Sequence, residues 1–354
     1  MGIAHAGESF DSAASGPMPS VSVIMLAWNN GPLLRIAAGS ILDQTMGDLE
    51  LVLVDNLSTD GSVDRLLAER PDPRIKVIRS PGSTSASAGY NMGAAQGTAP
   101  WIAIMDADDV AHPLRLELQL KAAAAEPAWD VIGTGAEAID VTGQKLGVWP
   151  SFYHPGEIRS YAPFGMPVIH PTLMGRREIF HHLNHRGEFT IGDDYDWVLR
   201  VLEQGGTIGA ISLPLLQYRR HQGSSTVQRV REAEACTAAI RLCAARRRAG
   251  QAERLEEVQA GVRRFLADNT PLPGLYLHFA RVCRREGFAV LAALHAALAV
   301  RERGGLRARL EFFRALAGAV RQDRGSLGPA LGGMVKGPFW VLLKRAGFPA
   351  FPRY

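Results

Sequence analysis

The sequence predicts an α/β fold with a mostly parallel sheet, and three observations support this prediction. Strand-like and helix-like segments alternate from residue 21 to residue 105, an order typical of a sheet covered by helices. The strand-like runs at residues 21–27 and 51–54 are apolar and rich in β-branched residues, as expected of strands buried on both faces. Polar residues directly follow three of these runs, at the edge of a parallel sheet where ligands bind.

The expected elements follow from apolar periodicity bounded by turn residues. Strands are expected at residues 21–27, 51–54, 75–78, 101–105, 130–135, 143–149, 172–175, 207–211 and 215–218. Helices are expected at residues 33–42, 62–70, 87–96, 113–125, 176–183 and 192–202. Pro32 suits the first turn of a helix, where no N–H is needed, and acids at residues 193–194 favour a helix start. Residues 151–171 are rich in Pro, His and aromatic side chains, so we expect an irregular loop that either binds substrate or only packs.

Three carboxylates stand together after the fourth expected strand, at Asp106, Asp108 and Asp109. They repel one another, and removing them from water at the end of a buried strand costs free energy that a divalent cation offsets. Oxygen ligands suit Mg²⁺ or Mn²⁺ and leave positions open for substrate phosphates. Taken alone, the motif fits equally well an acidic turn that binds nothing. The chain contains neither GxGxxG after its first strand nor GxxxxGK[ST], which disfavours dinucleotide and P-loop sites.

Composition places the chain among globular proteins of a reducing compartment. Its 354 residues are 47% hydrophobic, which is enough for a sizeable core. Cys236, Cys243 and Cys283 have neither metal-site spacing nor the pattern of a disulfide framework. Residues 1–19 are small and polar, so we expect a disordered tail and not a signal peptide. Because no apolar run is long enough to span a bilayer, we expect a cytoplasmic protein.

Charge divides the chain near residue 226. Residues 1–225 contain 16 Lys and Arg against 25 Asp and Glu, whereas residues 226–354 contain 23 against 10. The second part has helical periodicity, and its first helix, at residues 227–249, is expected to pack on the preceding domain. Its amphipathic basic segments are residues 306–320 and 339–345. They suit an anionic membrane surface and a helical bundle with a solvated basic face about equally, whereas nucleic-acid binding is disfavoured because no recognition motif is present.

Seven short motifs occur in a fixed order between residues 20 and 226. They are VSVIMLAWN at 21–29, VDNLSTDGS at 54–62, NMGAAQG at 91–97, MDADD at 105–109, HPTLM at 170–174, DDYDW at 193–197 and YRRH at 218–221. This order resembles the family 2 inverting glycosyltransferases. The resemblance implies a nucleotide-sugar-binding GT-A fold, a Rossmann-like α/β/α sandwich, for residues 20–226, followed by an α-helical region at 227–354. Two departures are Ala27, where the family often has Pro, and Asp193, where it has Glu.

The resemblance also implies roles for individual residues. It places the general base for the acceptor hydroxyl at Asp194, with Asp193 as the alternative. It places a divalent metal at Asp106 and Asp108, with Asp108 as the more direct ligand, and adds His221, where some relatives hold the metal or the diphosphate. It assigns contacts with the nucleotide sugar to Ala27, Asn29, Asp55, Asn91 and Asp106.

These residues together suit one reaction. Displacing a sugar from a nucleoside diphosphate needs a cation at the leaving group, a base at the acceptor and groups that hold the nucleotide in line. The sequence therefore predicts an inverting, metal-dependent glycosyltransferase. Its donor is a UDP-, GDP- or dTDP-sugar and its acceptor a glycan or glycolipid, in bacterial surface polysaccharide or glycolipid synthesis at the inner face of the membrane or in the cytoplasm.

Two rival functions are weaker. A nucleotidyltransferase would need cations after the first strand to hold a triphosphate, and residues 28–32 contain none. A non-catalytic scaffold that binds nucleotide sugars would fit the loss of Asp108 or Asp194, and both acids are present.

Several polar or aromatic residues have two possible roles. Asp196 is expected to be structural and paired with an arginine. His170 either packs in a loop or contacts the acceptor, and Trp28 either stacks on the nucleobase or packs in the core. His181 and His185 have helical spacing, but a helix ending between them disfavours a zinc site. Specificity is expected to reside in loops, mainly residues 80–90 and 150–171.

Overall fold

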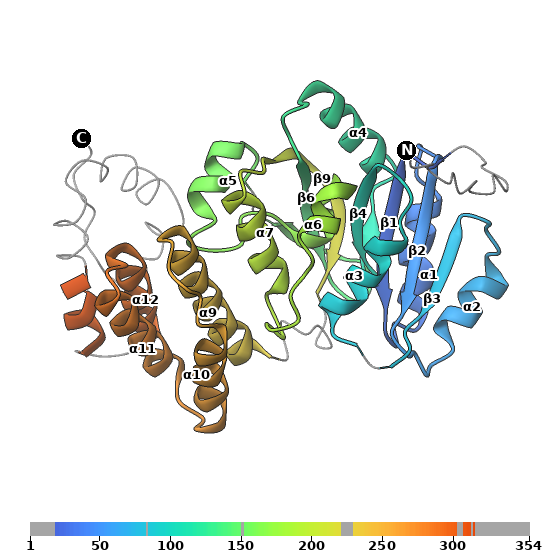
Figure 1. The fold of residues 1–354 in the computed structure, drawn as a ribbon. Helices are drawn as coiled ribbons and strands as arrows, with labels where there is room; N and C mark the ends of the chain where they lie inside the picture. Colours follow the sequence, from blue (N-terminus) through green and yellow to red (C-terminus); the bar gives the residue numbers. More distant parts are fainter. Residues whose placement is uncertain are drawn as a thin grey trace, which may run out of the picture.

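The protein is built around one mixed β-sheet with helices on both faces. The computed structural model describes residues 18–82, 84–149, 152–220, 229–302, 307–312 and 314–315. Within these residues the sheet has nine strands in the order β3-β2-β1-β4-β8-β6-β9-β5, and β7 pairs with β6. In Figure 1 the sheet occupies the right of the view, and the C-terminal helices extend to the left.

The first four strands form the parallel half of the sheet. They are β1 (Val21–Ala27), β2 (Leu49–Asp55), β3 (Ile75–Arg79) and β4 (Trp101–Asp106). Consecutive residues of β1 enter different hydrophobic clusters, with Val23 and Met25 on one face and Ile24 on the other. Burial on both faces explains the uninterrupted apolar runs, and the predicted parallel pairing is confirmed for these strands.

The second half of the sheet corrects the expectation of a mostly parallel sheet. Its strands are β5 (Val110–Ala111), β6 (Val131–Ile139), β7 (Lys145–Trp149), β8 (Met174–Arg176) and β9 (Ile208–Arg219). β6 and β9 are parallel, but β8 runs antiparallel to β4 and β6, β7 to β6, and β5 to β9. A buried strand has the same apolar pattern in either direction. The pattern therefore predicts where the strands are but not which way they run.

β9 is one strand where the sequence indicated two, at residues 207–211 and 215–218. The register of β6 against β9 shifts beside Gly135, which faces Pro214. Proline has no N–H to donate to the ladder, and the bulge accommodates this loss without ending the strand. A Cβ at Gly135 would lie 3.0 Å from the Leu213 carbonyl oxygen, so the bulge requires a residue without a side chain.

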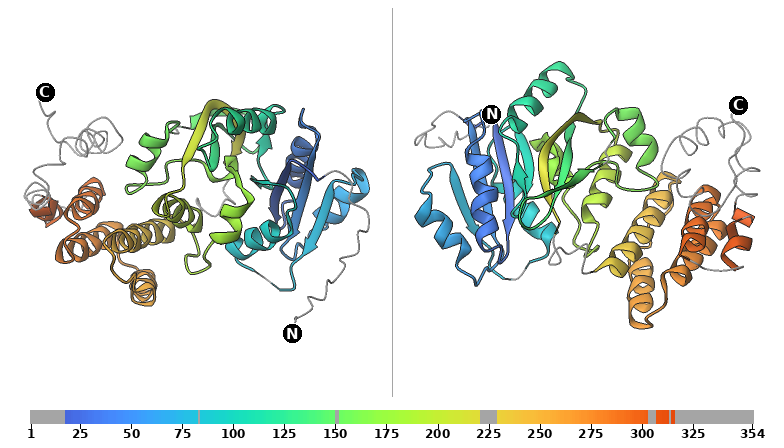
Figure 2. Two further views of the ribbon diagram at one scale, coloured as in Figure 1. Left: turned by 45° about the horizontal axis from the view of Figure 1, so that its top comes forward. Right: turned by 180° about the vertical axis from the view of Figure 1, so that it is seen from behind.

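Helices cover the two faces of the sheet in separate groups. One hydrophobic cluster joins the sheet to α1 (Pro32–Leu42), α2 (Ser62–Glu69) and α4 (Arg115–Ala125). The other joins it to α3 (Ala86–Gln96), α6 (Arg177–His182) and α7 (Asp193–Glu203), and continues into the C-terminal helices (Figure 2). The sandwich expected from the alternation of strands and helices is therefore present.

The segment 151–171 is more regular than expected. Part of it forms α5 (Pro155–Tyr161) and the start of a 3-10 helix (His170–Thr172). Pro155 stands in the first turn of α5, where a missing N–H costs nothing, and Ile158 is fully buried. A helix this short has too few apolar positions for periodicity to reveal it.

The C-terminal helices are α9 (Val230–Arg248), α10 (Leu255–Ala267), α11 (Leu272–Arg285) and α12 (Ala289–Arg301). α9 packs on the preceding domain as predicted, since Ile240 shares a hydrophobic cluster with Trp197 of α7. The apolar run of α12 is buried among these helices, and no helix of the described ranges is long and apolar enough to cross a bilayer. The segment 339–345, part of 306–320 and most of the tail 1–19 lie outside the described residues.

Two glycines allow α3 to approach β1 closely. A Cβ at Gly93 would lie 2.4 Å from Cγ2 of Ile24, and one at Gly89 would lie 2.5 Å from Cδ1 of Leu26. A larger residue at either position therefore forces the helix and strand apart. The side chain of Tyr90, between the two glycines, reaches the end of β4 because α3 lies this close.

We predict that Gly93→Ala destabilises the protein by about 1–3 kcal/mol, because the added methyl group overpacks the contact with Ile24. Urea unfolding followed by circular dichroism measures the change. Gly261→Ala is the matched control, since a Cβ at this position of α10 meets no atom within 4 Å. Alanine favours the helix there, so this variant should gain about 0.5–1 kcal/mol. Equal effects of the two substitutions would contradict the close approach of α3.

Candidate active site

The carboxyl ends of β1, β2 and β4 lie side by side at one edge of the sheet. Ala27 pairs with Asp55, and Leu26 pairs with Asp106, so the polar strand ends are level. The Ala27 carbonyl oxygen accepts a hydrogen bond from the Asn56 N–H at 2.9 Å. The structure therefore brings Ala27, Asp55 and Asp106 together, as expected for neighbouring parallel strands.

The turn after β1 is tied to the turn after β2. Asn29 has a left-handed backbone (φ 52), and its side-chain oxygen accepts the Thr59 N–H at 2.8 Å. The Asn29 N–H donates to the Ser58 hydroxyl at 3.2 Å, and the Ser58 N–H donates to Asp55 at 2.9 Å. Trp28 is 65% exposed, so the core role considered for it is wrong. Its other expected role, stacking on a nucleobase, is compatible with this exposure.

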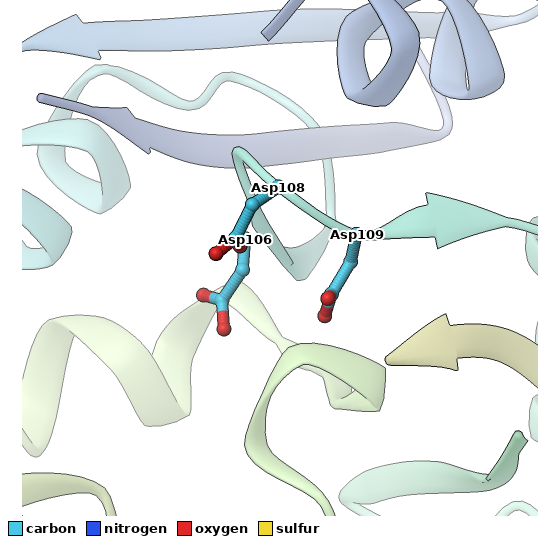
Figure 3. A group of neighbouring side chains, drawn as sticks. All are labelled: Asp106, Asp108 and Asp109. Atoms are coloured by element: carbon cyan, nitrogen blue, oxygen red, sulfur yellow. The ribbon is translucent and has the colours of Figure 1, made fainter. Parts of the chain in front are cut away.

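Asp106, Asp108 and Asp109 form an acidic cluster at the end of β4 (Figure 3). One carboxylate oxygen of each lies within 4.8 Å of the others, close enough to share a metal ion. Burial, and then the charge of Asp108, raises the pKa of Asp106. Burial also raises the pKa of Asp109 well above its usual value, and its Oδ2 has no hydrogen-bond partner among the described residues. These three carboxylates fit a divalent cation, which would supply both a charge and a partner.

Tyr90 and Arg219 support the acidic cluster from different elements. The Tyr90 hydroxyl donates to Oδ1 of Asp106 at 2.6 Å. The backbone N–H of Arg219 donates to Oδ1 of Asp109 at 2.7 Å, and Nε of Arg219 donates to the Asp108 carbonyl oxygen at 2.8 Å. The acidic turn is therefore anchored to α3 on one side and to β9 on the other.

A buried guanidinium lies behind the acidic turn. Arg115, in the first turn of α4, is fully buried and donates to the Ile104 carbonyl oxygen at 2.9 Å. It also donates to Gln119 at 3.2 Å, and Gln119 donates to backbone carbonyls of β6 and of the 3-10 helix. Burial lowers the pKa of Arg115 to about 10, while the nearby aspartates act in the opposite direction. Arg115 thus stays charged at neutral pH and offsets part of the acidic charge.

A second acidic group begins α7. The Ser87 hydroxyl of α3 donates to Oδ2 of Asp193 at 2.7 Å, and Oδ1 of Asp194 accepts the N–H of the next residue at 2.7 Å. Burial, and then the charge of Asp194, raises the pKa of Asp193 to about 6. Asp194 also raises the pKa of Asp106, and His170 lowers the pKa of Asp106 and Asp193. Ser87 and Tyr90 lie one turn apart in α3 and bond Asp193 and Asp106, so α3 places the first turn of α7 beside the acidic cluster. The His170 ring lies next to Tyr90, with ring centroids 5.2 Å apart.

Other residues singled out in the sequence have different surroundings. Both ends of the Asn91 amide bond the backbone of His185, Nδ2 donating at 2.7 Å and Oδ1 accepting at 2.8 Å. The nucleotide contact expected of Asn91 stays a prediction. His221 lies outside the described residues. α6 ends at His182, and the buried His185 stacks on Trp197 with ring centroids 5.4 Å apart.

Two residues of this site received no separate role in the sequence-based prediction. Tyr90 was not singled out, because its contact with Asp106 depends on how closely α3 packs on β1. Gly89 and Gly93 at helical spacing were the available signal of that close packing. Asp109 was expected only as part of the acidic turn, and its burial depends on β9, which is distant in sequence.

The mixed sheet with helices on both faces is the architecture expected of a GT-A fold. The fold is similar to a solved structure described as the crystal structure of S. aureus TarS 1–349, with a TM-score of 0.54 and 16% sequence identity. The likeness covers 84% of this chain and 88% of that chain. This likeness supports the expected GT-A fold, even though the two sequences have little in common.

Sequence comparison identifies the family. The family model for glycosyl transferase family 2 matches residues 22–183. The putative glycosyltransferase EpsE of Bacillus subtilis is 32% identical over 195 residues, which are 53% of this chain and 68% of the relative. The O-antigen biosynthesis glycosyltransferase WbnJ of Escherichia coli is 31% identical over 211 residues, 58% of this chain and 81% of the relative. The chain belongs to glycosyltransferase family 2 and is a glycosyltransferase.

We predict that Tyr90→Phe weakens Mn²⁺ binding about fivefold, the equivalent of about 1 kcal/mol for one hydrogen bond. The Tyr90 hydrogen bond lowers the pKa of Asp106, so its loss raises that pKa and favours the proton over the metal. The loss of affinity should therefore be larger at pH 5.5 than at pH 8, as measured by calorimetric titration of Mn²⁺. Tyr276→Phe is the control, because it removes a tyrosine–carboxylate bond, to Glu234, in the C-terminal helices. The same loss in both variants would refute a role for Tyr90 at the metal.

Proposed function

We propose that this protein is an inverting, metal-dependent glycosyltransferase that moves a sugar from a nucleotide-diphosphate donor to a hydroxyl acceptor. The observation that supports this most is the pairing of two acidic groups at one edge of the sheet. The acidic cluster after β4 and the acidic pair that begins α7 come from different elements, and α3 contacts both, through Tyr90 to Asp106 and through Ser87 to Asp193. A displacement reaction needs two such groups, one for the leaving group and one for the acceptor.

The leaving-group side is the acidic cluster. Asp106 and Asp108 would hold Mg²⁺ or Mn²⁺. Oδ2 of Asp109, which has no hydrogen-bond partner within the described part of the chain, makes Asp109 a further candidate ligand. His221 remains part of the proposed metal site from the sequence motif alone. When bound, the cation supplies positive charge to the diphosphate as the bond to the sugar breaks. Tyr90 and Arg219 keep the carboxylates oriented, so that little reorganisation accompanies the reaction.

The nucleotide side is the pair of turns after β1 and β2. Ala27, Asn29 and Asp55 lie there, next to the exposed indole of Trp28. We assign the nucleoside to this edge, with Asp55 as acceptor for its N–H or hydroxyl groups. One TarS structure, with a TM-score of 0.55 to this chain, is described as a complex with UDP-GlcNAc. A UDP-sugar is therefore the first donor to test.

The acceptor side is the first turn of α7. We assign the general base to Asp194, which lies near Asp106, with Asp193 as the alternative. The pKa of about 6 that burial gives Asp193 is close to the range in which a base is most effective. In a single displacement the base takes the proton of the acceptor hydroxyl while the sugar leaves the diphosphate, and the anomeric configuration inverts.

We place the reaction in the synthesis of bacterial surface polysaccharide or glycolipid. Two relatives of this chain are named for such pathways, the O-antigen enzyme of Escherichia coli and the succinoglycan biosynthesis protein ExoO of Rhizobium meliloti. The acceptor is then a growing glycan, free or lipid-linked. The excess of basic residues after residue 226 suits an anionic surface, so we place the enzyme at the inner face of the cytoplasmic membrane.

The donor assignment predicts metal-dependent binding of one nucleotide. Calorimetric titration of UDP, GDP and dTDP, each with Mn²⁺ and with EDTA, should show one nucleotide that binds at least about tenfold more tightly with the metal. Asp108→Ala should abolish this difference, whereas Asp268→Ala, an exposed acid in the C-terminal helices, should leave it unchanged. Folded protein that binds none of the three nucleotides would exclude the proposed function.

If Asp194 is the base, its loss should lower the rate of transfer but not the affinity for the nucleotide. Asp194→Asn should lower kcat by about 10²–10⁴-fold, with the Kd of the nucleotide changed less than about threefold, because the base acts on the acceptor and not on the donor. If Asp193 is the base, the rate rises with pH through about 6 as its proton leaves, and Asp193→Asn abolishes that limb. Steady-state rates from pH 5 to pH 9 decide between the two acids. Near wild-type rates in both variants would reject α7 as the source of the base.

A further inference from the structure

Asp196 is a buried carboxylate that the proposed reaction does not use. It lies one turn after Asp193 in α7 and is fully buried. Arg186 binds it through two hydrogen bonds of 2.8 Å and 2.7 Å, Arg200 donates a third at 2.8 Å and Arg247 a fourth at 3.3 Å. The bonds to these arginines hold the pKa of Asp196 below its usual value despite its burial. The structural, arginine-paired role expected for it is therefore correct.

The arginine that comes from furthest along the chain is Arg247, near the end of α9. Its Nη1 lies 3.3 Å from Asp196 and 3.0 Å from Glu253, and its Nε donates to Glu203 of α7 at 2.6 Å. Glu253 also accepts from Arg186 at 3.1 Å. One network of alternating charges thus joins α7, α9 and the segment that precedes α7.

The same segment is joined to the acidic pair through α3. The Ser87 hydroxyl that donates to Asp193 at 2.7 Å also lies 3.3 Å from the Arg186 carbonyl oxygen. The neighbouring residue, His185, is fixed by both ends of the Asn91 amide. A continuous set of contacts therefore runs from Arg247 through Asp196 and Arg186 to the carboxylate of Asp193.

We propose that Asp196 is a positioning residue for sugar transfer, and that α9 acts through Arg247 to fix the first turn of α7. This inference rests on the proposed function, since that turn carries the proposed base. Buried ion pairs add little net stability, because desolvation offsets their attraction, but their directional bonds fix geometry. Displacing a reacting group by about 1 Å can lower a rate about a hundredfold. The C-terminal helices then belong to the catalytic apparatus, whatever else they bind.

The test removes only the contact from α9. Arg247→Gln leaves Asp196 bonded to Arg186 and Arg200, so the remaining network keeps the carboxylate paired. We expect kcat to fall about 10- to 100-fold, while the Kd of the nucleotide in the presence of Mn²⁺ changes less than twofold. Arg247→Lys should recover part of the rate. The assay is nucleotide release from the UDP-, GDP- or dTDP-sugar whose nucleotide binds in the titration.

Arg248→Gln is the matched control. Arg248 is the next residue of the same helix and also binds Glu203, at 3.2 Å, but it is not a hydrogen-bond partner of Asp196 among the described residues. We expect its kcat to stay within twofold of wild type. An equal loss of kcat in both variants, or a lowered Tm with unchanged kcat for Arg247→Gln, would show a purely structural network and overturn the proposal.

Ser87→Ala tests the other end of the contacts if Arg247→Gln does not fold. The Ser87 hydrogen bond holds the first turn of α7 in place, so its loss should lower kcat. That bond also lowers the pKa of Asp193, so if Asp193 is the base, the acid limb of the pH profile moves to higher pH as well. An unchanged rate and profile would overturn the proposal. Failure of the proposed function is distinct, because wild-type protein would then neither bind a nucleotide with Mn²⁺ nor release one from its sugar.

Discussion

The repulsion among carboxylates at the end of β4 is the constraint around which the rest of this structure is arranged. Asp106 is oriented by Tyr90 of α3, Asp109 by the backbone of Arg219 in β9, and Arg115 places a buried positive charge behind the turn. These contacts fix the acids in place without neutralising all of their charge. The sheet edge is therefore preorganised for the cation that we propose there.

Local sequence patterns predicted the parallel half of the sheet, because β1, β2 and β4 are mostly apolar runs with a polar residue at or directly after their ends. Asp55 and Asp106 were expected at one edge for the same reason. The pattern could not reveal that β8 enters antiparallel between β4 and β6, since a buried strand reads alike in both directions. Nor could it show that a bulge opposite Gly135 absorbs Pro214 and leaves β9 continuous. The direction and the register of a strand depend on contacts between segments that are far apart in the chain.

In the candidate site, too, local sequence predicted some residues, while others depend on distant contacts. Residues at strand ends could be predicted, whereas the contact of Tyr90 with Asp106 depends on how closely α3 packs on β1. The sequence predicted that Asp196 pairs with an arginine but not which one. One of its partners, Arg247, lies beyond the change in charge composition near residue 226. The hydrophobic core crosses that change without interruption, from Trp197 of α7 to Ile240 of α9. The charge composition therefore changes near residue 226, whereas the hydrophobic packing continues across that position.

The exposed indole of Trp28 gives the protein an intrinsic optical reporter at the edge to which we assign the nucleotide. Trp28 is 65% exposed, whereas Trp197 of α7 is completely buried and stacks on Phe180 of α6. Indole emission shifts to longer wavelength in water, so the long-wavelength part of the fluorescence spectrum reports mainly on exposed tryptophans such as Trp28. A base that stacks on this ring removes it from water and changes that part of the spectrum, while the emission of Trp197 serves as an internal reference. Occupancy of the edge can thus be followed in real time, without a label and without knowledge of the sugar.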